Sequence, residues 1–157
     1  EKLYRFCHNN PFVEFHPVTY THNIATLSKI ENLISINSAF QVDLYGQVNA
    51  EMTGDYHIGG TGGQVDFIRG SKQSKGGKSI ICLSSTAQNG GISRIVPSFD
   101  RYTPVTSLRA DIDGVVTEFG LAELRGKSMR QRAQALIEIA HPDFRQGLKD
   151  AFAKYWP

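Results

Sequence analysis

The sequence has few cysteines, no long apolar run and little net charge, and each shortage excludes a class of protein. Two cysteines in 157 residues, Cys7 and Cys82, are too few for a disulfide-stabilised scaffold. We therefore expect a reducing compartment, the cytoplasm. No apolar stretch approaches the ~20 residues that cross a bilayer, so no membrane association is expected.

Charge and histidine spacing exclude two further classes. The net charge is +2, and the cationic stretch at residues 70–78 contains no interleaved aromatic side chains, which disfavours a nucleic-acid binder. The five histidines show no His-Glu-x-x-His spacing. The sequence therefore predicts no metal site.

What remains is an ordinary globular composition, with 40% hydrophobic residues and 15 glycines. This length predicts one domain spanning residues 1–157. The first residue is Glu1 rather than Met, and from this we expect an excised piece or a processed product.

The most informative segment is a glycine-rich loop. Four of the five residues 59–63 are glycine, and the Gln-Val-Asp-Phe that follows, residues 64–67, is typical of a first helical turn. Bare backbone N–H groups at the positive start of a helix favour a phosphate, a carboxylate or a developing oxyanion. A purely structural turn is the equally weighted alternative.

Two familiar nucleotide motifs are excluded by counting. A dinucleotide fingerprint beginning at Gly60 would need its third glycine at Val65. A P-loop ending at residues 77–79 would need a glycine at Lys72. Both hydride transfer and nucleotide hydrolysis therefore lose support.

Alternating strands and helices predict a mixed α/β domain. Ser128 with Gln131 forms a capping-box pattern before a helix that Pro142 ends. A further helix is expected after that proline. Strands are expected at residues 12–15, within 33–48, and at 79–83, 92–96 and 115–117, and helices at 24–30 and after the glycine loop.

Seven segments, taken in order, resemble the carboxy-terminal domain of the acetyl-CoA hydrolase/transferase family. They cover nearly the whole chain, and their agreement in order is more specific than any one of them. They are residues 9–11, 42–49, 59–67, 74–79, 116–120, 124–128 and 140–144.

The resemblance implies a three-layer α/β/α domain of the CoA-transferase superfamily. It also implies that a glutamate attacks an acyl-CoA thioester and becomes a glutamyl-CoA thioester, from which a second carboxylic acid takes the CoA. In this family the nucleophile belongs to the amino-terminal half, so we expect this chain to lack it. Glu51 is interpreted as a solvated strand-end carboxylate.

The same resemblance implies the catalytic support. The amides of Gly62 and Gly63 would face the thioester oxyanion, with the side chain of Asn9, or of Asn10, as a further donor. Glu118, between an apolar strand and Gly120, would orient the nucleophile or bind substrate. A turn at the Asn pair, and a helix-start carboxylate at Glu118, are the structural alternatives.

Four cations are candidates for the phosphates of CoA: Lys72, Lys75, Lys78 and Arg94. Their alternative is a solvated cationic surface. The expected substrates are an acyl-CoA and a small carboxylic acid of the acetate, 4-hydroxybutyrate or succinate type, with CoA as the coenzyme. The expected protein partners are the amino-terminal half of the same polypeptide and a second copy in a homodimer.

The function predicted from the sequence is therefore that of the carboxy-terminal part of a CoA-transferase. Two alternatives stay open. An acyl-CoA hydrolase would resolve the same intermediate with water, and a non-catalytic CoA-binding module would use the same loop without chemistry. The identity of the acyl group is open as well.

Overall fold

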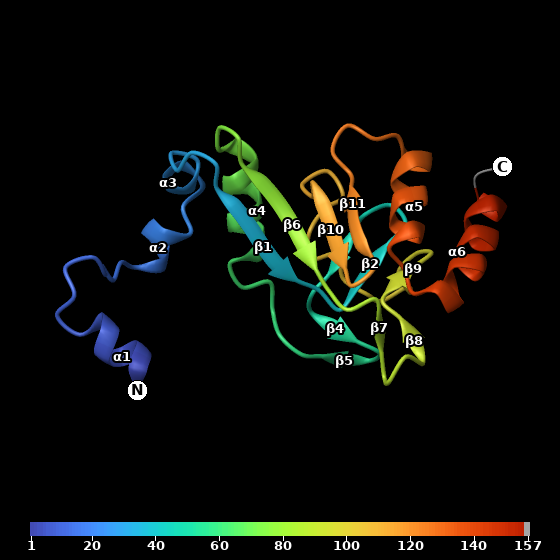
Figure 1. Cartoon of the computed structure of the whole chain (residues 1–157), viewed down its shortest axis with the longest axis horizontal. Helices are drawn as coiled ribbons and strands as arrows, with labels where there is room; N and C mark the ends of the chain where they lie inside the picture. Colours follow the sequence, from blue (N-terminus) through green and yellow to red (C-terminus); the bar gives the residue numbers. More distant parts are fainter. Residues whose placement is uncertain (156–157) are drawn as a thin grey trace.

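The computed structural model describes residues 1–155 and has a central sheet with an amino-terminal arm that extends away from it (Figure 1). The helices are α1 (Lys2–Cys7), α2 (Val18–Thr21), α3 (Ile24–Leu27), α4 (Gln64–Gln73), α5 (Met129–Glu138) and α6 (Pro142–Tyr155). The strands are β1 (Ile34–Ser38), β2 (Gln41–Asp43), β3 (Val48–Asn49), β4 (Met52–Thr53), β5 (Tyr56–His57), β6 (Lys78–Cys82), β7 (Thr86–Ala87), β8 (Ile92–Ser93), β9 (Ile95–Val96), β10 (Gly114–Thr117) and β11 (Gly120–Glu123).

The main sheet has the strand order β1-β6-β10-β11. Its first three strands are parallel, and β11 returns antiparallel to β10. The carboxyl ends of three parallel strands therefore meet at one edge, where Ser38, Cys82 and Thr117 are the last strand residues. In open α/β sheets this edge is where ligands bind.

One face of this sheet is covered. Ile81, Val115 and Ala122 occupy neighbouring register positions and are 0–1% exposed. Helix α4 packs on β1 and β6, and α5 packs on β11. The small sheet β3-β2-β9 contributes Val42 and Ile95 to the same core. Alternation of buried and exposed side chains along each strand produces this division.

The opposite face is open within residues 1–155. Ile36 and Leu121, which project to that side, are 64% and 53% exposed. Ile80, the register neighbour of Ile36, is half-buried. The α/β class predicted from the sequence is confirmed, and the helices that pack on the main sheet, α4 and α5, share a single face.

A buried polar cluster fixes the turn between β2 and β3. Asp43 accepts hydrogen bonds from the amides of Tyr45 and Gln47 at 3.1 and 2.9 Å, and burial raises its pKa above the ordinary value. Arg132 of α5 donates to the carbonyl oxygen of Tyr45 at 3.0 Å. At Gly46, where φ is +86°, a Cβ would lie 2.5 Å from Arg132, so the turn needs glycine.

Most of the predicted elements are confirmed. Helix α4 follows the glycine loop, β6 and β10 lie where apolar runs predicted them, and α5 begins with the capping box of Ser128 and Gln131. The strand predicted at residues 12–15 is wrong, because this segment is irregular and lies outside every sheet. The predicted strand at 92–96 is divided into β8 and β9.

No helix among residues 1–155 combines the length and the apolar character needed to span a membrane. The predicted helix over residues 24–30 is shorter in the structure and ends at Leu27.

Candidate functional site

A cavity of about 240 Å³ lies where β1 ends and the glycine loop begins. It brings together segments far apart in sequence: the residues after β1, the loop itself, the first residue of α4, and the segment between β8 and β9. Its lining residues are Ser38, Ala39, Phe40, Ala50, Gly60, Thr61, Gln64 and Arg94.

The glycine loop presents backbone donors. Gly62 has a left-handed φ of +52°, which glycine adopts without strain, and Gly63 is the N-cap of α4 with no capping side chain. Among the described residues the amides of Gly62 and Gly63 have no hydrogen-bond acceptor. These N–H groups are therefore available to an anion beside the positive end of the helix.

Contacts on either side hold the start of α4. The side-chain amide of Gln64 donates to the Ser107 hydroxyl at 3.1 Å, which ties the first helical residue to the loop before β10. The ring of His22 lies against Gly63, where a Cβ would come within 2.3 Å of it. Sequence reasoning missed His22, because it lies 41 positions before Gly63 on a different helix pair.

Arg94 reaches the same cavity from the other side. Its backbone is held on both sides, since its N–H donates to Ser85 at 2.8 Å and its carbonyl accepts from Val42 at 2.9 Å. Its guanidinium has no hydrogen-bond or ion-pair partner among residues 1–155. The structure thus brings one of the four predicted cations to the glycine loop.

Glu118 lies just beyond the end of β10, with its carboxylate locked onto Ser85. The Ser85 amide donates to Oε2 at 2.8 Å and its hydroxyl to Oε1 at 2.7 Å. The Ser85 hydroxyl, then backbone N–H groups and finally the charge of His141, hold the pKa of Glu118 below its usual range. The backbone carbonyl of Ser85 also accepts the backbone N–H of Arg94, so Ser85 joins the segments that carry Glu118 and Arg94.

The three predicted lysines are not brought together. Lys72 donates to the carbonyl of Ala110 and lies 3.4 Å from Asp111, whereas Lys75 pairs with Glu31 at 3.2 Å. Both lie at or beyond the carboxyl end of α4, the end opposite the glycine loop. Their charges are therefore partly neutralised within the chain.

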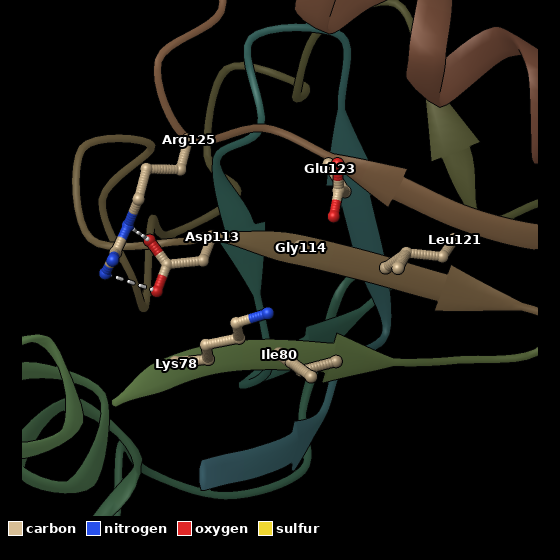
Figure 2. Close-up of a pocket in the computed structure, with 7 residues that line it drawn as sticks. All are labelled: Lys78, Ile80, Asp113, Gly114, Leu121, Glu123 and Arg125. Carbon is tan, nitrogen blue, oxygen red and sulfur yellow. Dashed lines mark hydrogen bonds and ion pairs between the residues drawn. The ribbon is translucent and has the colours of Figure 1, made fainter. Parts of the chain in front are cut away.

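Lys78 lies on the open face of the main sheet (Figure 2). It borders a second cavity of about 240 Å³ whose floor includes Ile80 and Leu121. At its rim, Arg125 makes a two-pronged pair with Asp113 at 2.6 and 2.8 Å. This cavity is separate in its lining residues from the one at the glycine loop.

Asn9 and Asn10 lie on the amino-terminal arm, which Figure 1 shows extending away from the sheet. Asn9 has a left-handed φ of +52° and its amide contacts His8 at 3.3 Å. The Asn10 side chain donates to Phe6 and accepts from Phe12, both at 3.0 Å. Within residues 1–155 the pair forms a turn and does not reach the glycine loop.

Across residues 1–155, no group of three histidine, cysteine, aspartate or glutamate side chains is arranged to hold a metal ion. The first cavity is lined by Gly60 and Thr61 of the glycine loop and by Arg94, and the amides of Gly62 and Gly63 follow next along that loop. That set suits a ligand carrying anionic or strongly polarised oxygens.

The profile of the acetyl-CoA hydrolase/transferase C-terminal domain matches residues 1–152. The chain belongs to this family. Among curated proteins, a 4-hydroxybutyrate coenzyme A transferase of Clostridium kluyveri is 53% identical over 154 residues, which cover 98% of this chain and 36% of the relative. The acetyl-CoA hydrolase/transferase domain described here thus spans about a third of the length of that relative.

Solved structures agree with this assignment. RipA from Yersinia pestis has a TM-score of 0.90 at 42% identity, over 98% of this chain and 34% of that one. A 4-hydroxybutyrate CoA-transferase from Porphyromonas gingivalis has a TM-score of 0.83 at 44% identity, over 99% of this chain and 35% of that one. The acetyl-CoA hydrolase/transferase domain therefore has the fold of these two proteins.

Proposed function

We propose that this chain is the part of a CoA-transferase that holds the acyl-CoA thioester while CoA moves between an acyl-CoA and a carboxylic acid. The observation that carries the proposal is the cavity in which the glycine loop, the start of α4 and Arg94 converge. The family membership supports the reaction class, and the remaining two-thirds of the transferase would be the partner region.

In this proposal, the amides of Gly62 and Gly63 stabilise the oxyanion that forms when a carboxylate attacks the thioester carbonyl. Donors aimed at a developing oxyanion are typically worth about 3–4 kcal/mol each. Glycine suits these positions because a side chain at Gly63 would collide with His22, and because Gly62 has positive φ. Arg94 would bind an anionic group of CoA or of the carboxylic acid.

The covalent steps balance without any other reagent. The attacking glutamate, which we place in the amino-terminal region of the polypeptide, displaces CoA thiolate and forms a mixed anhydride. The thiolate then attacks the glutamyl carbonyl, which releases the first carboxylate and leaves a glutamyl-CoA thioester. Reversal with a second carboxylate completes the exchange, and Glu118 is proposed to orient the reacting carboxylate from the edge of β10.

Transfer is favoured over hydrolysis by the degree of similarity. The Clostridium kluyveri relative named as a transferase is 53% identical, whereas an acetyl-CoA hydrolase of Neurospora crassa is 37% identical over 128 residues. Hydrolysis would need only that water replace the second carboxylate. The distinction is therefore a matter of which acceptor reaches the glutamyl-CoA thioester.

The experiment joins this chain to the amino-terminal two-thirds of the Clostridium kluyveri relative and compares it with the chain alone. Incorporation of labelled acetate into acetyl-CoA measures transfer, and release of free thiol measures hydrolysis. We expect the joined protein to exchange label faster than it releases thiol, and the chain alone to do neither. Thiol release without exchange would favour the hydrolase.

A control addresses Glu51, the one alternative nucleophile considered. Its carboxylate is half-buried rather than solvated as expected, and it accepts a hydrogen bond from the Thr106 hydroxyl at 2.8 Å, which ties its turn to a segment 55 residues later. Exchange by the chain alone, abolished by Glu51→Gln, would overturn the division of labour proposed here.

A further inference from the structure

The four glycines of the loop differ in what surrounds them. A Cβ at Gly59, Gly60 or Gly62 would meet no atom within 4 Å. At Gly63 it would lie 2.3 Å from both Cδ2 and Nε2 of His22. Among residues 1–155, His22 is therefore the side chain against which this loop packs through one of its glycines.

The His22 ring is itself held in place. Its Nδ1 is 2.9 Å from the Thr21 hydroxyl, and its ring meets the Phe67 ring edge-on with centroids 5.1 Å apart. Phe67 is in the first turns of α4, the helix that the loop begins. The imidazole is thus fixed from its own helix pair and from the helix that follows the loop.

This contact belongs to a close approach of two helices. Gly70 lies seven residues after Gly63, two helical turns along one side of α4. A Cβ at Gly70 would come within 2.5 Å of Leu27 on α3. Two glycines on one side of α4 therefore allow the segment from His22 to Leu27 to pack against it, with His22 at the loop end and Leu27 at the far end.

We propose that His22 is a positioning residue for the glycine loop, one that holds Gly63 and hence the amides that face the acyl-CoA oxygen. The inference rests on the proposed function, since it assigns His22 a role at that same site. A glycine-rich segment has high backbone entropy, so donors on it act as preorganised donors only if something restrains them. The His22 ring, which lies between Thr21, Phe67 and Gly63, supplies that restraint.

The first test removes the imidazole ring of His22. In ¹⁵N-labelled protein, His22→Ala is expected to lower the backbone order parameters of Gly60–Gly63. It is also expected to weaken the binding of acetyl-CoA about 3- to 10-fold, because the loop must then be ordered on binding. His22→Phe keeps a flat ring in the same place and is expected to retain the loop order. Unchanged order parameters in His22→Ala would overturn the inference.

The second test asks whether a smaller side chain at position 22 makes room for a methyl group at position 63. Gly63→Ala alone places a methyl group against the His22 ring and is expected to weaken acetyl-CoA more than His22→Ala does. The double variant His22→Ala/Gly63→Ala makes room for that methyl group and is expected to recover to within about 3-fold of His22→Ala, a coupling typical of residues in contact. Additive losses of acetyl-CoA affinity in the double variant would contradict a direct contact between the two positions.

A matched control is Gly70→Ala, which strains the same helix pair at its other end. It is expected to lower the thermal midpoint while leaving loop order and acetyl-CoA affinity unchanged. If Gly70→Ala loosens the loop as much as His22→Ala does, His22 is only one part of general helix packing and the inference fails. If loop order falls in His22→Ala but the protein joined to its amino-terminal region binds no acetyl-CoA, the proposed function fails while the loop restraint stands.

Discussion

The two ends of helix α4 carry two different anion-binding candidates, the glycine loop at the amino end and the lysines at the carboxyl end. The surroundings of these two candidates differ. At the amino end, the Arg94 guanidinium borders the cavity beside the glycine loop, and neither it nor the amides of Gly62 and Gly63 have a hydrogen-bond partner among residues 1–155. At the carboxyl end, Lys72 and Lys75 are ion-paired with Asp111 and Glu31. The candidate site is therefore distinguished by hydrogen-bond donors without a partner beside a cavity, and not by the number of positive charges.

The largest effect is expected from Gly63→Pro at the amino end. Proline removes the N–H proposed to face the oxyanion, and its ring would collide with His22, which lies 2.3 Å from the position of a Cβ. In the protein joined to its amino-terminal region, turnover should fall by a factor of about 10² or more. The control is Gly59→Ala, which has open space around it. Near-normal turnover in folded Gly63→Pro would remove this amide from the mechanism.

A smaller effect is expected when charge is removed from each end in turn. Arg94→Gln should weaken the binding of CoA about 10- to 100-fold, because a hydrogen bond to a charged group contributes roughly 1.5–3 kcal/mol. Lys72→Gln/Lys75→Gln/Lys78→Gln removes three charges but should weaken CoA less, because two are paired and Lys78 borders another cavity. Calorimetry in low and moderate salt measures both, and a larger loss in the lysine variant would reverse the comparison.

The smallest effect concerns the stability that Glu118 contributes through Ser85. Hydrogen bonding lowers the folded-state pKa of Glu118, so its contribution is present above the unfolded-state pKa near 4.3 and is lost as pH falls through the folded-state value. Glu118→Gln should therefore be less stable than wild type at pH 7, with the gap closing in acid. Urea titrations at several pH values measure this, and a gap that is independent of pH would exclude the carboxylate's charge as its cause.

Part of this arrangement was predictable from local sequence. The glycine-rich run and the helix after it are local features, and so is the position of Glu118 after an apolar strand. Their placement at one edge follows from parallel pairing of β1, β6 and β10. The role of Arg94 at the loop required the pairing of β9 with β2, which no local pattern specifies.

The lysines and His22 show why the rest was not predictable. Lys72, Lys75 and Lys78 are close in sequence and were all candidates for the phosphates of CoA, but α4 ends at Gln73 and β6 begins at Lys78, so the three diverge. The seven-residue spacing of Gly63 and Gly70 signals a close approach to one side of α4. Which segment makes that approach is decided by tertiary packing of a helix pair about 40 residues earlier.

The most direct test of the account is a comparison of acetyl-CoA with CoA, titrated into the ¹⁵N-labelled protein. The two ligands share every phosphate and differ at the sulfur, so the difference between their amide shifts reports on the acyl group. We expect this difference to be largest at Gly60–Gly63 and Gln64, and small at residues 72–78. Unchanged loop amides at saturating acetyl-CoA, or a difference centred on the lysines, would contradict it.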